Sequence, residues 1–326
     1  TTLGKRWWGY VEAGQHEQVL MEFGLMSMGV LESDNPEAIL SADERLTMDF
    51  LEGLRDVKVP DEMRQSIWNQ VGVVADQFND PGNFTAFIGY EWTSMPDGNN
   101  LHRNVLFRDS AEKTSQIMPF SSMDSGDPED LWAFLAEYEK KTGGSVMAIP
   151  HNGNVSNGLM FAETTLDGKP LTKDYADRRS RWEPIVEVTQ IKGDGEAHPF
   201  LSPNDEFADF ETWDKGNLDA SVAKKKEMLE FEYARSALKN GMKLEARLGT
   251  NPYKFGMIGS SDAHTGLAAM EEENFFGKTT PQEPSPERLK AAFMDDAKSG
   301  VKIMDWEVQA GGYAAVWAEE NTRTSI

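Results

Sequence analysis

The hydrophobic pattern along the chain changes near residue 82. Before that point, apolar residues recur at helical spacing and form one stripe, at Ile67, Val71, Val74 and Phe78. After it, short apolar runs alternate with amphipathic segments, a pattern typical of strands that alternate with helices. We therefore predict a helical cap or insertion over residues 1–82 and a β/α region over residues 83–326, together forming one structural domain.

Apolar runs within the second region predict strands, at residues 84–92, 145–150, 185–190, 255–260 and 301–304. The helix predicted over 127–144 has Asp127 as its N-cap, Pro128 in its first turn and Gly143 as its stop. Further helices are predicted over residues 224–248 and 285–300. This alternation favours an α/β fold in which crossover helices join parallel strands, and a chain of 326 residues is long enough for a barrel of this type.

The predicted strands end in residues that bind metal ions. The run 84–92 contains Glu91 near its end, the run 145–150 leads into His151, and the run 255–260 leads into Asp262 and His264. In a β/α barrel the carboxyl ends of the strands meet on one face, where the active site is built. Asp262 and His264 also have the spacing that would direct both side chains to one side of a strand. We expect these residues to form one cluster.

The segment 91–109 contributes a further histidine to this face. Its Pro-Asp-Gly sequence predicts a turn that folds two apolar segments back on each other and brings His102 near Glu91. We expect the loop 191–200, which follows the run 185–190, to lie over the same face. The candidate catalytic and substrate-binding residues of these segments are Lys192, Arg103, His198, Asn152 and Glu196.

The composition narrows the chemistry of the site. The 32 Lys and Arg residues against 55 Asp and Glu residues give a net charge of −23, which repels phosphate backbones and makes nucleic acid an unfavourable partner. The chain has no cysteine, so His, Asp and Glu are the available metal ligands. No apolar stretch is long enough for a membrane span, and no signal-peptide core opens the chain.

Each candidate ligand also has an ordinary structural interpretation. An Asp-x-His sequence occurs by chance, Glu91 is able to act as a capping or ion-paired carboxylate, and His151 is able to sit in a turn. The metal-site interpretation gains from convergence, because four of the five histidines occur at strand ends or in the loops that follow. His16 is the exception and is interpreted as a helix-surface residue, and an exposed loop imidazole is the alternative for His198.

The segments "IGYEWT", "LHRNV", "IPHN" and "GSSDAHTG" resemble, in order and spacing, the PHP (polymerase and histidinol phosphatase) superfamily. The resemblance covers most of residues 60–320 and is strongest to a branch of uncharacterised bacterial proteins containing a domain of unknown function. It implies a distorted (β/α)7 TIM-like barrel of the PHP type that holds two or three metal ions and hydrolyses phosphate esters. It also implies that Glu91, His102, His151, Asp262 and His264 are metal ligands and that "KGDGEAHP" is the substrate-side loop.

The chain departs from this family pattern at its beginning and end. Members carry a His-x-His sequence at the end of the first strand and an Asp-His pair at the end of the second, and neither sequence occurs here. The family pattern also continues into a further strand-rich segment beyond the last residues of this chain. We therefore expect a barrel that is incomplete at both ends, with about half of the metal cluster. The location of a bacterial protein of this kind, periplasmic, secreted or cytoplasmic, stays open.

The ligand types suit zinc, manganese or iron, and spacing alone does not select among them. A metal-bound water ionises with a pKa of about 7, which would supply hydroxide as the nucleophile. We predict a metal-dependent phosphoesterase acting on a small phosphorylated substrate, in which Lys192 or Arg103 neutralises charge on the phosphoryl oxygens. A metallohydrolase for a non-phosphate ester or amide is the first alternative, since fold does not fix substrate. A non-catalytic metal-binding or ligand-binding protein is the second.

Overall fold

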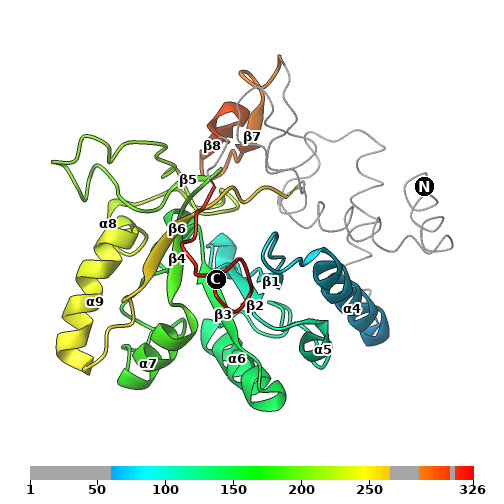
Figure 1. Ribbon diagram of the computed structural model, residues 1–326. Coiled ribbons are helices and arrows are strands. Elements are labelled where there is room, and N and C mark those ends of the chain that lie inside the picture. The colour runs from blue at the N-terminus through cyan, green and yellow to red at the C-terminus, as the bar shows by residue number, and fades with distance from the viewer. Residues whose placement is uncertain (1–59, 265–285, 309–312) are drawn as a thin grey trace. The chain divides into compact units, whose positions relative to one another are not determined.

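The computed structural model describes residues 60–264, 286–308 and 313–326 (Figure 1). The chain divides into two compact units, Thr1–Gln70 and Val71–Ile326, and helix α4 (Asp61–Phe78) runs through the boundary. The helix predicted from the apolar stripe is confirmed by α4. His16 and most of the predicted cap over residues 1–82 lie outside the described residues.

The first sheet is an antiparallel meander of β1 (Ile88–Trp92), β2 (Arg103–Phe107) and β3 (Val146–Pro150). The predicted turn forms a short 3-10 helix, η2 (Pro96–Gly98), between β1 and β2. The register aligns the end of β1, the start of β2 and the end of β3, because Arg103 pairs with Trp92 on one side and Pro150 on the other. The segments that flank these positions, including Glu91, His102 and His151, therefore share one edge of the sheet.

Helix α6 (Pro128–Thr142), which follows the short helix α5 (Ala111–Thr114), confirms the predicted helix 127–144 and its signals. The Asp127 side chain accepts a hydrogen bond of 2.9 Å from the Glu129 N–H, and Gly143 ends the helix in the left-handed conformation, with φ 61°. The helix buries an apolar face made of Leu131, Trp132, Leu135 and Tyr138. Because caps and stripe both follow from nearby residues, this element could be predicted from the sequence alone.

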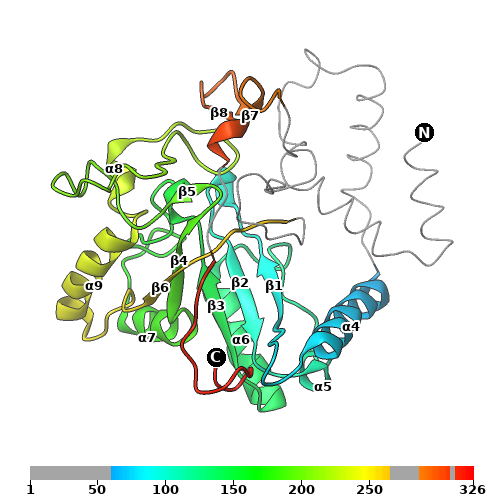
Figure 2. The same cartoon turned by 45° about the horizontal axis from the view of Figure 1, so that its top comes forward.

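The second sheet has β4 (Ile185–Gln190) at its centre, with β5 (Gly193–Asp194) antiparallel on one side and β6 (Gly256–Gly259) parallel on the other. Helix α7 (Lys173–Trp182) precedes β4, and β4 lies beside β3 (Figures 1 and 2). After β6 the chain crosses the ends of the neighbouring strands (Figure 2), where the Ser260 N–H donates to the Thr189 carbonyl over 3.0 Å. This crossing carries Asp262 and His264 toward β1.

The predicted helix over 224–248 is two helices, α8 (Lys226–Leu229) and α9 (Ala234–Leu248). The backbone between them bonds to other segments instead of continuing the helix, since the Phe161 N–H donates to the Phe231 carbonyl and the Ala234 N–H donates to the Gly195 carbonyl. Glu232 is fully buried at this break and forms an ion pair with Lys224. Tertiary hydrogen bonding has thus overridden local helix propensity.

The predicted helix over 285–300 is wrong. The described part of that segment contains β7 (Ala292–Asp295), which pairs antiparallel with β8 (Lys302–Met304) before the 3-10 helix η6 (Asp305–Glu307). Phe293 packs against a buried cluster that includes Trp213, Val301 and Ile303. The hairpin places Phe293 and Ile303 on this cluster, and that packing outweighs the helical signals of a Ser-Pro opening.

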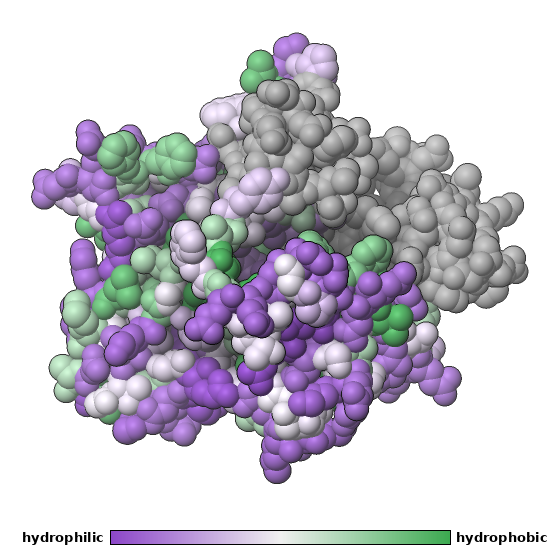
Figure 3. All heavy atoms as spheres, in the orientation of Figure 1, coloured by the Kyte–Doolittle hydropathy of each residue, from purple (hydrophilic) through white to green (hydrophobic). Residues whose placement is uncertain are grey.

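The expectation of parallel strands holds for the pair β4 and β6 and is wrong for the remaining described strand pairs, which are antiparallel. Over residues 60–264, 286–308 and 313–326 the hydrogen-bonded strands form three small sheets. Hydrophilic residues cover most of the described surface on the face in Figure 3, with hydrophobic residues in scattered groups. Among the helices described, none is long and apolar enough to cross a membrane.

Candidate metal centre

Five side chains meet at the shared edge of the strands, and we refer to them as the Glu91 cluster: Glu91, His102, His151, Asp262 and His264. Glu91 comes from β1, His102 directly precedes β2, and His151 directly follows β3. Asp262 and His264 arrive on the segment after β6. The predicted fold-back of the segment 91–109 therefore does bring His102 to Glu91.

One oxygen of Glu91 lies between two imidazoles. The Nδ1–H of His102 donates to Glu91 Oε1 over 2.8 Å, and the Nε2–H of His151 donates to the same oxygen over 2.9 Å. The two rings are nearly perpendicular, with centroids 5.6 Å apart. Glu91, His102 and His151 each offer one ligand atom, and these atoms all lie within 4.8 Å of one another. Such spacing is compatible with the ligand bonds of about 2.1 Å that a zinc ion makes to nitrogen and oxygen.

Asp262 and His264 complete the cluster on its other side. His264 Nε2 lies 3.8 Å from Glu91 Oε2 and 3.9 Å from Asp262 Oδ1. The two residues do not lie on a strand, as their spacing had suggested, because β6 ends at Gly259 and Asp262 is in the left-handed conformation with φ 54°. That conformation is uncommon for a residue other than glycine, although aspartate and asparagine adopt it most readily. The local turn, and not strand periodicity, brings both side chains to Glu91.

The electrostatics of the cluster favour an anionic Glu91. Burial alone would raise the pKa of Glu91, but hydrogen bonds from His102 and His151, together with the nearby His264 imidazole, hold that pKa far below its usual range. Burial lowers the pKa of His102, although its hydrogen bond to Glu91 opposes this. Burial would also lower the pKa of His151, but Glu91, Glu187 and Asp262 together raise it. The site therefore concentrates negative charge around imidazoles, an environment that suits a cation.

The residues present fit a divalent metal ion. The second ring nitrogens of all three histidines are buried and have no hydrogen-bond partner within the described ranges, at His102 Nε2, His151 Nδ1 and His264 Nδ1. Buried polar atoms without partners are rare in native proteins and call for an explanation such as an ion. Imidazole with carboxylate is a donor set used for zinc, manganese and iron. Together, the donor set and the spacing support a metal centre at the Glu91 cluster.

Lys192 borders this centre, as predicted. Its Nζ forms an ion pair with Asp262 Oδ2, and the side chain is 7% exposed. Gln190, the last residue of β4, also donates to Asp262 Oδ2 over 2.7 Å, and its Nε2 donates to Asn152 Oδ1 as well. The Gln190 Oε1 accepts a bond of 2.7 Å from the Lys192 N–H. One buried amide thus connects Asp262, Lys192 and Asn152.

Asn152 belongs to this network and not to the ligands. It is buried with φ 52°, directly after His151. The Asn100 side chain donates to the His151 carbonyl over 2.7 Å and to the Asn152 carbonyl over 3.1 Å, which fixes this backbone. Asn154 donates to the Lys192 and Trp213 carbonyls over 3.0 Å each. These amides hold the loops that carry His151 and Lys192.

The structure does not bring Arg103, Glu196 or His198 to the Glu91 cluster. Arg103 points away from His102 and pairs with Glu183 over 3.0 Å, since successive residues of a strand face opposite sides. Glu196 accepts a hydrogen bond of 2.9 Å from Arg235. The Nε2–H of His198 donates to Asp214 over 2.9 Å, and its Nδ1 accepts from the Phe200 N–H, so both ring nitrogens have partners. Their proposed contacts with a substrate at the cluster therefore have no support in this geometry.

Gln190 and Asn100 are the site residues that sequence reasoning missed. Gln190 ends a strand that was correctly predicted, so its position at a strand end was an available signal. Asn100 gave no comparable signal, because its role depends on carbonyl groups about fifty positions away in the chain.

Comparison with known proteins identifies a family for this chain from its sequence. No curated protein and no solved structure matches it. The sequence model of one protein family, described as "Protein of unknown function (DUF3604)", matches residues 29–326. Because the match covers most of the 326 residues, the chain belongs to the DUF3604 family.

Proposed function

We propose that this protein is a metal-dependent hydrolase and that its substrates are small phosphate esters. The observation that carries the proposal is the convergence of three chain segments on the carboxylate of Glu91 in β1, with a buried lysine beside the resulting cluster. A purely structural ion-pair network would not need three imidazoles whose remaining nitrogens have no partner in the described part of the chain. Perturbed titratable groups gathered in this way are a feature of functional sites.

Glu91, His102 and His151 would hold the first ion, and Asp262 and His264 would contribute to it or to a second. When bound, a divalent ion supplies a Lewis acid that acidifies water and polarises a phosphoryl oxygen. Lys192 provides a fixed positive charge next to Asp262, where it would bind and orient an anionic substrate oxygen. Gln190 keeps Asp262 in place by donating to the same carboxylate oxygen.

We extend the proposal to the PHP superfamily and to its distorted (β/α)7 barrel. The support is the order of the sequence segments that carry Glu91, His102, His151 and the Asp262–His264 pair, together with the shared strand edge on which those segments end. A full set of ligands of that type would hold two or three ions of zinc, manganese or iron. The His-x-His and Asp-His sequences that such proteins use are absent from this chain, so fewer ions are expected here than in a full set.

Metal binding and hydrolysis are tested on the same protein. After treatment with chelator and dialysis, the wild type should bind at least one Mn²⁺ or Zn²⁺ per chain in a calorimetric titration. Glu91→Gln should weaken that binding at least tenfold, because it removes the charge on which the three histidines converge. Glu137→Gln is the matched control, since Glu137 is an exposed carboxylate on α6 that forms an ion pair with Lys140.

Hydrolysis is then measured with a phosphomonoester, a phosphodiester, a carboxylic ester and an amide. The proposal predicts turnover of a phosphate ester that chelator and Glu91→Gln both abolish and Glu137→Gln preserves. Turnover limited to the carboxylic ester or amide would replace phosphoesterase with the other class of metallohydrolase. Fewer than one ion per chain, or turnover indifferent to chelator, would overturn the metal mechanism.

A further inference from the structure

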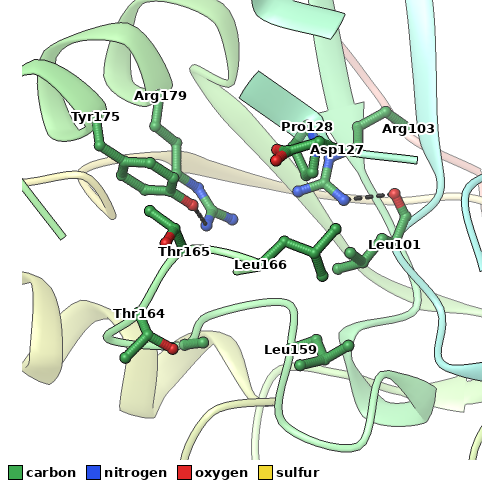
Figure 4. A pocket seen from close by; sticks show the side chains of 11 residues that line it. Leu101, Arg103, Asp127, Pro128, Leu159, Thr164, Thr165, Leu166, Tyr175 and Arg179 are labelled. Atoms are coloured by element: carbon green, nitrogen blue, oxygen red, sulfur yellow. Dashed lines mark hydrogen bonds between the residues drawn. The ribbon is translucent and has the colours of Figure 1, made fainter. Parts of the chain in front are cut away.

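A second polar site lies on the other side of β2 from the Glu91 cluster. It is a cavity of about 30 Å³, bordered by the start of α6, by α7 and by the loop 159–166 (Figure 4). This volume has room for about two water molecules or for one small polar group. None of the described residues that line the cavity belongs to the Glu91 cluster, so this site is separate from the proposed metal centre.

Two buried arginines supply the polar wall of this cavity. Arg103 Nε donates to Glu183 Oε1 over 3.0 Å, and Arg179 Nε lies 3.1 Å from Glu183 Oε2. Both guanidinium groups are less than 4% exposed, and they share this one carboxylate. Burial lowers the pKa of Arg103, and the neighbouring Arg179 lowers it further against the opposing charge of Glu183. The immediate surroundings of the pair thus hold two positive charges and one negative charge.

Arg103 also directs a hydrogen-bond donor into the cavity. Its Nη1 donates to the Leu101 carbonyl, and its guanidinium group lies at the wall of the cavity in Figure 4. Arg179 donates from Nη1 to the Tyr175 hydroxyl over 3.2 Å and from Nη2 to the Met160 carbonyl over 2.8 Å. Each of these two Nη groups carries two hydrogens, so each retains a donor.

The surrounding elements also favour an anion. The cavity adjoins Asp127 and Pro128 at the start of α6, where a helix of 15 residues presents its positive end. Among the described residues that line the cavity, Asp127 is the acidic one, and its carboxylate lies at this positive end and accepts a hydrogen bond from the Glu129 N–H as the N-cap. A guanidinium group matches a planar carboxylate better than a spherical ion, because its donors form a rigid fork.

The remaining wall is apolar. Leu101, Leu159 and Leu166 line the cavity opposite the arginines, and Leu166 lies at its exposed side, where 41% of the residue is accessible (Figure 4). A ligand that joins one negative planar group to a short alkyl group would satisfy both walls. We propose that this cavity binds a short-chain carboxylate, with its carboxylate group on Arg103 and Arg179 and its alkyl group against the leucines.

Binding is measured with sodium acetate as the probe, on the whole protein with ¹³C-labelled leucine methyl groups. Sodium chloride keeps the ionic strength constant. The methyl signals of Leu101 and Leu159 should shift and saturate, with half-saturation at roughly 0.05 mM or weaker for a ligand of four heavy atoms. Acetate should bind more tightly than formate, because its methyl group places apolar surface against the leucines.

Two variants of Leu166, at the exposed side of the cavity, test whether binding requires a negative charge on the ligand. They leave the buried arginines in place. Leu166→Asp adds a negative charge and should weaken acetate binding at least tenfold, whereas Leu166→Asn has similar shape without charge and should change it less than threefold. Unsaturable shifts, equal binding by both variants, or an equal response to chloride alone would each overturn the proposal. None of these readouts depends on metal or hydrolysis, so the outcome is independent of the proposed function.

Discussion

Replacing Gln190 with methionine tests how the proposed metal centre is held in place. Gln190 is 1% exposed and makes three side-chain hydrogen bonds, to Asp262, to Asn152 and from the Lys192 N–H. Methionine has a similar length, but it is unable to donate the bonds to Asp262 and Asn152 and has no carbonyl oxygen to accept the bond from the Lys192 N–H. The variant Gln190→Met therefore removes the support of Asp262 while leaving all five members of the Glu91 cluster in the chain.

Gln190→Met is expected to lower both the free energy of unfolding and the affinity for metal. Asn152 Oδ1 and the Lys192 N–H each lose a hydrogen-bond partner in a buried region, and each such loss costs about 1–3 kcal/mol. The free energy of unfolding should thus fall by about 2–6 kcal/mol, a large part of the 5–15 kcal/mol typical of a folded protein. Loss of a partner that orients a metal ligand weakens metal affinity by about 10- to 100-fold, and we expect a decrease in this range.

Urea unfolding of the metal-free protein measures the free energy of unfolding, and a titration with Mn²⁺ measures the metal affinity. Gln116→Met is the control, because Gln116 is exposed and bonds to the carbonyl of the preceding turn. That control should stay within about 0.5 kcal/mol of the wild type and bind metal normally. If Gln190→Met loses stability but keeps wild-type metal affinity, Asp262 does not depend on Gln190 and our account of the site is refuted.

Three further predictions concern stability. Glu183→Gln should lower the free energy of unfolding in urea by about 3–5 kcal/mol, because Arg103 and Arg179 would lose their shared carboxylate; a change below about 1 kcal/mol would contradict this role. Gly153→Ala should lower the melting temperature, since its Cβ would lie 2.4 Å from the Glu232 carbonyl oxygen, and an unchanged melting temperature would show that the loop yields freely. Burial raises the pKa of Glu232 to about 7 from 4.5, so its contribution to stability is present below pH 4.5 and is lost as pH rises through 7. The loss should approach roughly 3 kcal/mol and should disappear in Glu232→Gln, whereas equal pH profiles of the two proteins would oppose it.

The sequence carried enough local information to predict several elements and most of the Glu91 cluster. Helix α6 is set by Asp127, Gly143 and its apolar stripe, which lie within one segment. The strands near 146–150 and 185–190 follow from short apolar runs, and the turn at Pro96–Gly98 follows from its Pro-Asp-Gly sequence. Because ligand-type residues follow strands whose ends share an edge, their convergence could be predicted before any coordinate was known.

For polar residues outside the Glu91 cluster, the partners are decided by the tertiary structure alone. Arg103 follows His102 directly, yet strand geometry turns it to the opposite face, where a carboxylate 80 positions away pairs with it. The segment 286–300 has helical signals, but burial of Phe293 against Trp213 and Val301 favours a hairpin. These outcomes depend on contacts between distant segments, whose free energies exceed the local propensities that a single sequence displays.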